Sequence, residues 1–124
     1  VRLLTMGTQR DKAYVYYTAR KRYALLLQKD IRLHEYQPSM MHGKVILIDD
    51  QWVSFGSANL DPRSFFHNDE LNLCTNNTEL VDQIEAFFHT GFESSQRINL
   101  KSWQRRPLNQ KIAGAFGTLF YWQM

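Results

Sequence analysis

The sequence predicts an α/β domain with a mixed β-sheet. Segments with the alternation or β-branched content of strands are followed along the chain by segments with helical periodicity. Two neighbouring predicted strands, 44–48 and 52–55, are joined by the short polar turn Asp49-Asp50-Gln51 and must therefore run antiparallel. The 124 residues are enough for one hydrophobic core.

Residues 1–38 contain three predicted elements. These are a strand at 1–5, a helix at 11–28 and a strand at 31–36 that is stopped by Pro38. The central run 44–48 is almost wholly apolar and rich in β-branched residues, which predicts a strand that is buried on both faces.

In the second half of the chain, the residues that start helices are easier to recognise than the periodic patterns inside the elements. Asp61-Pro62 is expected to start a short helical turn, because proline suits the first helical position. A strand is predicted at 70–75, and Asn76-Asn77-Thr78 is expected to cap a helix at 79–89. After Gly91 the pattern weakens.

The net charge of +3 is unevenly distributed. Lysine and arginine gather in 1–34 and 97–124, whereas 35–96 holds most of the acids. Basic ends predict an anionic partner, either lipid headgroups or nucleic acid. We divide the chain into a catalytic half-domain, 1–105, and a basic, aromatic C-terminal tail, 106–124.

Three further features concern the cysteine content of the chain, its start and its longest apolar runs. Cys74 is the single cysteine, which excludes an internal disulfide, and its apolar-alternating neighbours predict a buried thiol. The chain opens at Val1 as if a strand were already under way, so we expect it to come from a longer protein. No apolar run approaches the ~20 residues that span a bilayer.

His42 and Lys44 are the first candidates for catalysis. Because they are two residues apart on a predicted strand, their side chains should share one face, about 7 Å apart. That gap suits a phosphate held between an imidazole and an ammonium. Asp49 has odd spacing from His42, so it is expected to face away, orient the turn and not touch substrate.

The loop 56–59 is expected to lie beside these two residues. The return strand leads it back to the start of strand 44–48, where Ser57 and Asn59 can offer a hydroxyl and an amide to phosphate oxygens. Gly56 is expected to let the backbone pass close to the ligand. The alternative for Ser57 is a simple turn residue.

Transfer of a phosphodiester without a metal needs a nucleophile, a proton donor and fixed positive charge. A neutral His42 can attack phosphorus if a partner holds its tautomer, and Glu70 is the candidate partner. Lys44 supplies the positive charge. No residues have the spacing of zinc ligands, so neither a metal nor another cofactor is expected.

One histidine cannot be both the nucleophile and the acid for the leaving group. The other three, His34, His67 and His89, lack a similar set of neighbours and are expected to be surface or packing residues. A second His–Lys set must therefore come from another part of the full chain or from a second subunit.

The spacing H-x-K-x₄-D, followed after six residues by G-S-A-N, resembles the HKD motif of the phospholipase D superfamily. The longer run 56–65, with Asn68 and Glu70 after it and Tyr36-Gln37-Pro38 before the motif, resembles the bacterial cardiolipin synthase branch. The resemblance covers about residues 1–105, is closest to the C-terminal half of such enzymes, and is weak in the tail.

The resemblance implies an α/β/α sandwich that forms one half of a two-half catalytic unit. It places Asp49 with His42 and Lys44 in the catalytic motif, and Glu70 where the family has its histidine-orienting acid. One histidine would become a phosphohistidine, and the histidine of the other half would protonate the departing glycerol. Which of these roles His42 has stays open. Phosphatidylglycerol is the implied substrate, at the bacterial cytoplasmic membrane.

The basic and aromatic end of the chain is expected to lie on an anionic membrane through Trp103, Arg105 and Arg106. An ordinary packing helix with a solvated face explains it equally well, and Arg63 could anchor either acidic neighbours or a lipid phosphate. Two other functions stay open: a homodimeric phosphodiesterase or nuclease, with nucleic acid the less expected partner, and an inactive isolated half-domain.

Overall fold

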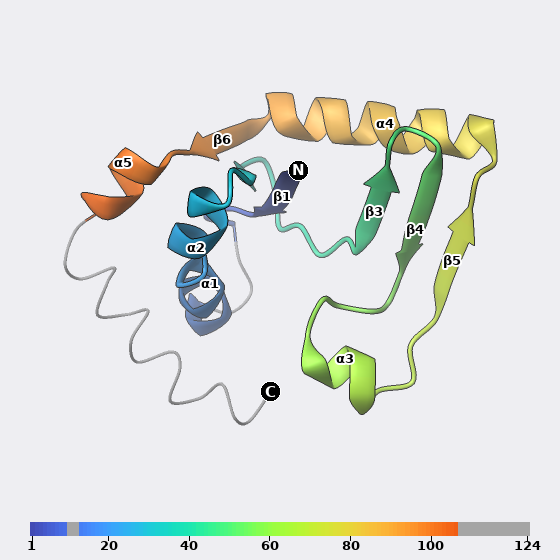
Figure 1. Ribbon diagram of the computed structural model, residues 1–124, viewed down its shortest axis with the longest axis horizontal. Helices are drawn as coiled ribbons and strands as arrows, with labels where there is room; N and C mark the ends of the chain where they lie inside the picture. Colours follow the sequence, from blue (N-terminus) through green and yellow to red (C-terminus); the bar gives the residue numbers. More distant parts are fainter. Residues whose placement is uncertain (10–12, 107–124) are drawn as a thin grey trace. The chain divides into compact units, whose positions relative to one another are not determined.

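The computed structural model describes residues 1–9 and 13–106, and it confirms the α/β class and the mixed sheet (Figure 1). The described residues form two compact units, one within 1–41 and 91–106, the other of 42–90. Each unit has its own three-stranded sheet, so the strands predicted for a single sheet are divided between two.

The first unit contains the mixed sheet, in which β1 runs parallel and β6 antiparallel to the central strand β2. The helix predicted at 11–28 is two helices, separated by a turn at Lys21 and Arg22. The elements of this unit are β1 (Arg2–Met6), α1 (Ala13–Arg20), α2 (Tyr23–Gln28), β2 (Arg32–Tyr36), β6 (Ser95–Ile98) and α5 (Leu100–Gln104).

The core of the first unit is a row of apolar side chains across its sheet. Leu33 pairs in register with Leu3 on one side and with Ile98 on the other, and its side chain is completely buried. Tyr23 and Trp103 pack on this row from α2 and α5, with ring centroids 5.1 Å apart. Burying side chains of this kind contributes about 1.5–3 kcal/mol each, which fixes the helices on the sheet.

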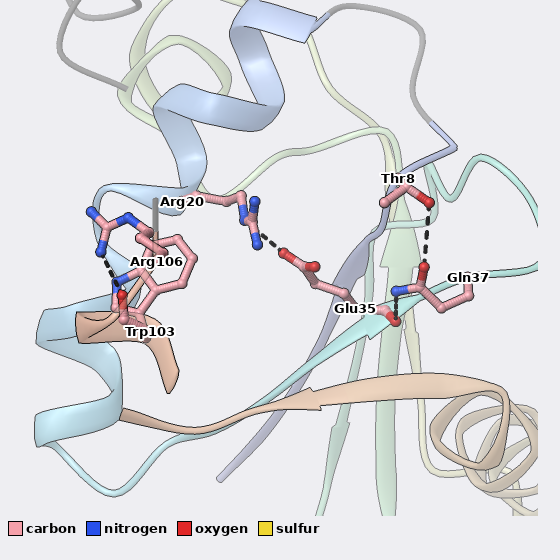
Figure 2. Close-up of polar contacts among 6 residues, drawn as sticks. All are labelled: Thr8, Arg20, Glu35, Gln37, Trp103 and Arg106. Atoms are coloured by element: carbon pink, nitrogen blue, oxygen red, sulfur yellow. Dashed lines mark hydrogen bonds and ion pairs between the residues drawn. The ribbon is translucent and has the colours of Figure 1, made fainter. Parts of the chain in front are cut away.

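A buried carboxylate lies beside this core. Glu35 of β2 is 2% exposed, and its Oε1 lies 2.9 Å from Nε of Arg20 in α1 (Figure 2). The hydroxyls of Tyr23 and Tyr16 also donate to this carboxylate. Burial raises the pKa of Glu35, and the nearby Arg20 charge opposes this shift only in part. The ion pair connects α1 to the central strand.

A side-chain clamp holds the chain just after β2, five residues before His42. Nε2 of Gln37 donates to the backbone carbonyl of Glu35 over 2.9 Å, and Oε1 of Gln37 accepts from the Thr8 hydroxyl over 3.3 Å (Figure 2). Gln37 thus ties the ends of the two parallel strands together at the point where the chain leaves them.

The second unit has an antiparallel sheet in the order β3-β4-β5. The predicted turn between the first two strands is present: the Gln51 N–H donates to the Ile48 carbonyl over 3.0 Å, and Asp49 and Asp50 have φ of 50° and 51°. Positive φ at both central positions is the hairpin conformation that matches the strand twist. The elements are β3 (Val45–Ile48), β4 (Trp52–Gly56), α3 (Pro62–Phe66), β5 (Asn72–Thr75) and α4 (Thr78–Glu93), whose last residues belong to the first unit.

Two expectations about burial in the second unit are wrong. Strand β3 is not buried on both faces, because Ile46 and Ile48 are 40% and 49% exposed. The central strand β4 supplies the fully buried residue instead, Val53, since an edge strand has a neighbour on one side only. Cys74 is exposed and not buried, and its thiol contacts the Ser54 hydroxyl over 3.4 Å.

Both predicted helix starts are present. Oδ1 of Asp61 accepts from the Ser64 N–H over 2.8 Å at the start of α3, and Oδ1 of Asn77 accepts from the Leu80 N–H over 3.0 Å at the start of α4. The elements β6 and α5 were not predicted. The boundary at 105/106 stays a prediction, because tail residues 107–124 lie outside the described part.

Candidate active site

His42 and Lys44 lie side by side immediately before β3. Nζ of Lys44 is 3.1 Å from Nδ1 and 3.2 Å from Nε2 of His42, and it also donates to the His42 carbonyl over 3.2 Å. The tips are closer than the backbone spacing suggests, because the long lysine side chain folds back over the ring. A neutral imidazole has one unprotonated nitrogen, and the ammonium can donate a hydrogen bond to that atom.

Gly56 brings the loop 56–59 to this pair. Its N–H donates to the Lys44 carbonyl over 3.2 Å, so the loop begins beside Lys44, as the return strand predicted. A Cβ at position 56 would lie only 2.1 Å from the Leu71 carbonyl oxygen. The structure therefore requires glycine here for the close approach of another chain segment, a different reason from the predicted approach of a ligand.

Ser57 uses its polar atoms on the segment after α3. Its N–H donates to the Leu71 carbonyl and its Oγ accepts from the Leu71 N–H, both over 3.0 Å. Its hydroxyl also bonds to the Glu70 carboxylate, so its single proton points to that acceptor. Contact of Ser57 with a phosphate stays a prediction.

Glu70 is held as an anion by several donors. Hydrogen bonds from Ser57, Ser64 and Asn68 lower the pKa of the Glu70 carboxyl, and the charge of Lys44 lowers it further. The bond from Nδ2 of Asn68 measures 3.1 Å. Within residues 1–9 and 13–106, no hydrogen bond joins Glu70 to the His42 ring. The role of Glu70 in orienting that ring therefore stays a prediction.

Asp49 lies in the turn between β3 and β4, whereas Asn59 lies in the loop that follows β4. The Asn59 side chain is exposed, and its N–H donates to the Ser64 hydroxyl over 3.1 Å. Asp49 lies in the turn that follows β3, whereas His42 precedes that strand. The structure thus gathers Asn59, Glu70 and Lys44 around one loop and leaves Asp49 in the turn.

Contact of Trp103 with a membrane is a wrong expectation. The Trp103 side chain is 5% exposed, and the Arg106 guanidinium lies 4.0 Å above its ring while donating to its backbone carbonyl over 2.9 Å (Figure 2). Trp103 belongs to the core because α5, begun by the Asn99 cap, turns it onto Tyr23. Arg105 is exposed and Arg106 is half-buried, and contact of these two residues with a membrane stays a prediction.

Comparison with known protein families identifies the family to which the chain belongs. Residues 1–91 match the family described as cardiolipin synthase, PLD-like domain. The chain belongs to this family. The recognition of the phospholipase D superfamily and its cardiolipin synthase branch is thereby confirmed.

Several curated relatives are cardiolipin synthases. That of Geobacillus kaustophilus is 33% identical over 88% of this chain and 22% of the relative. Cardiolipin synthase 2 of Bacillus anthracis is 33% identical over 90% of this chain and 22% of the relative. Cardiolipin synthase A of Pseudomonas putida is 39% identical over 67% of this chain and 18% of the relative. The chain spans about a fifth of the length of these relatives.

A solved structure shares the fold. NucT from Helicobacter pylori superposes with a TM-score of 0.52 at 22% sequence identity, covering 76% of this chain and 79% of that one. Among the described residues, no helix combines the length and the apolar character that crossing a bilayer would require.

Proposed function

We propose that the chain supplies one His–Lys half of an active site that transfers a phosphatidyl group between phospholipids, as in the synthesis of cardiolipin. The observation that carries the proposal is the contact of the Lys44 ammonium with the His42 ring in a member of the cardiolipin synthase family. These are the positive charge and the nucleophile or acid that metal-free phosphoryl transfer needs.

The proposed reaction has two displacements. In the first, a neutral imidazole nitrogen attacks phosphorus, the bond from phosphorus to the leaving glycerol oxygen breaks, and a second histidine gives that oxygen a proton. In the second, the acceptor alcohol attacks the phosphohistidine, the phosphorus–nitrogen bond breaks, and the second histidine takes back a proton. His42 fits either role.

The contact between Lys44 and His42 has a consequence for substrate binding. An imidazole nitrogen that accepts a hydrogen bond from the ammonium has its lone pair occupied and cannot attack phosphorus. A bound phosphate offers the ammonium anionic oxygens, which are stronger acceptors than an imidazole nitrogen. Substrate binding is therefore proposed to draw Lys44 from the ring and free the nucleophile.

Exposed apolar side chains support a lipid as substrate. Leu60 directly follows Asn59, Leu71 directly follows Glu70, and both are largely exposed, at 77% and 82%. Phe66 in the intervening helix α3 is 79% exposed. In a phospholipid the acyl chains are one glycerol away from the phosphate, so apolar residues beside the phosphate site favour a lipid over a nucleic acid.

Two further parts of the proposal concern the second half of the active site and the membrane at which the protein acts. A second His–Lys half, from the same longer protein or from a second copy, is proposed to complete the site. The basic residues toward both ends, including Arg105, are proposed to attract the chain to the anionic surface of a bacterial cytoplasmic membrane, where phosphatidylglycerol is the substrate.

The test is a lipid analysis of a bacterial strain that lacks its own cardiolipin synthases and expresses the protein carrying this chain. Wild-type protein should restore cardiolipin on a thin-layer plate, and His42→Ala should lower its formation about 100-fold or more, the usual worth of acid–base catalysis. His67→Ala is the matched control, because it removes an exposed histidine of the same unit that has no lysine two residues on.

Three results would reject the proposal. Unchanged cardiolipin formation in His42→Ala would exclude a catalytic role for His42. An equal loss in His67→Ala would show that the effect is not specific to His42. Purified protein should also form cardiolipin on phosphatidylglycerol vesicles and leave plasmid DNA intact. Cleavage of the plasmid without lipid transfer would favour the nuclease alternative.

A further inference from the structure

Ser64 is a buried polar residue at the start of the short helix α3. Its side chain is 7% exposed, and its N–H is fixed by the Asp61 side chain over 2.8 Å. A buried hydroxyl is costly unless its hydrogen bonds are made, so its partners indicate why a serine is tolerated at this position.

The partners of the Ser64 hydroxyl are two of the candidate site residues. Its oxygen accepts a hydrogen bond from the Asn59 N–H over 3.1 Å. Its proton is available for the Glu70 carboxylate, with which it also bonds. A hydroxyl has one proton and two lone pairs, so both bonds can exist together. Ser64 therefore joins the loop that carries Asn59 to the segment that carries Glu70.

We propose that Ser64 is a positioning residue, which holds Asn59 and Glu70 in place for phosphoryl transfer and does not touch the substrate. The inference rests on the function proposed above for the residues around His42. Asn59 and Glu70 are eleven residues apart in the sequence, and Ser64 fixes both with one hydroxyl inside the second unit.

The surroundings of Glu70 give this proposal a measurable signature. Ser57 and Asn68 donate to the same carboxylate, and Lys44 is the charged group that acts on it. Removal of the Ser64 hydroxyl takes away one of three donors and leaves the lysine in place. The carboxylate then loses part of what stabilises its charge, and its pKa should rise.

The experiment is a titration of Ser64→Ala and wild-type protein labelled with ¹³C in the glutamate carboxyl groups, followed by NMR. The Glu70 resonance is assigned with Glu70→Gln. We expect the pKa of Glu70 to be higher in Ser64→Ala than in wild type. In the lipid-transfer assay, kcat should fall about 3- to 10-fold, the worth of one hydrogen bond, and the acidic limb of its pH profile should move to higher pH.

Ser54→Ala is the matched control. Ser54 lies in β4 and is buried to the same degree, at 6% exposed, but its hydroxyl contacts Asn72 and Cys74. Its removal should lower stability without moving the titration of Glu70. Ser64→Thr keeps a hydroxyl and should restore most of the wild-type titration, whereas loss of packing alone would not be rescued in this way.

The proposal is overturned if the titration of Glu70 is the same in Ser64→Ala and wild type, or if Ser54→Ala shifts it equally. Should Ser64→Ala not fold, Ser64→Cys keeps the size but weakens the donor, and an unchanged Glu70 titration in that variant overturns the proposal too. The NMR result does not need turnover. A wild-type protein without transfer activity would therefore reject the proposed function and still decide the role of Ser64.

Discussion

At the scale of single residues, Gly56 controls whether the loop of the candidate site can form. A side chain there would meet backbone atoms, with its Cβ 2.1 Å from the Leu71 oxygen and 2.7 Å from Asn72 Cα. Backbone cannot swing aside as a flexible side chain can, so β5 would have to move away. We expect Gly56→Ala to lower the free energy of unfolding by about 1–3 kcal/mol, the usual cost of overpacking. Urea denaturation followed by circular dichroism measures this.

Gly43→Ala is the control for the Gly56 experiment. A Cβ at position 43 would have only Val45 Cγ2 nearby, at an ordinary 3.9 Å. Its effect on stability should stay within about 0.5 kcal/mol, as for most exposed positions. Equal stability of the two variants would mean that the close approach of residue 71 to Gly56 does not exist in solution.

At the scale of elements, the sequence predicted those whose signals are local. The proline and aspartate at 61–62 and the cap at Asn77 give the starts of two helices, and the aspartates at 49–50 give the hairpin. Strand β6 was missed because its polar sequence becomes a strand only by pairing with β2, some 60 residues earlier. Burial of Trp103 was missed for the same reason, since it depends on packing against α2.

In the candidate site, too, the sequence predicted the local contacts and not the long-range ones. Proximity of His42 and Lys44 follows from a spacing of two residues, and the structure brings them together. The contacts of Ser57 and Ser64 with Glu70 depend on how the segment after α3 returns to the loop, so no local pattern predicts them. One signal could have identified Ser64, which stands three residues after a helix-capping aspartate.

The ion pair that connects α1 to β2 should make stability depend on pH. The pKa of Glu35 is raised by burial, more than the charge of Arg20 lowers it. The folded state therefore favours the protonated form, and the stability that this form contributes is lost as the pH rises from the ordinary carboxyl pKa through the raised one. Relative to Glu35→Gln, which stays neutral, wild type should become less stable from about pH 4 upward.

Urea denaturation of both proteins at a series of pH values tests the sign of this effect. Glu85→Gln, which removes an exposed carboxylate from α4, controls for the change in net charge. A constant difference between wild type and Glu35→Gln would contradict the prediction. A wild type that gains stability over the variant with rising pH would show that Arg20 outweighs burial.

At the scale of the whole molecule, one His–Lys pair implies that a single copy of this chain cannot complete the proposed reaction. The two displacements need two histidines, and among the four in the chain only His42 has a lysine two residues on.

If two copies of the chain supply the two histidines, the transfer rate in dilute solution should rise with the square of the chain concentration. If the second set belongs to a longer protein, this chain alone should show no turnover until that half is added. Rates measured over a hundredfold range of concentration, with the mass of the active species from light scattering, separate these cases. A rate proportional to concentration from a monomer would refute the need for a second half, because one imidazole would then be attacking phosphorus and protonating the leaving oxygen at once.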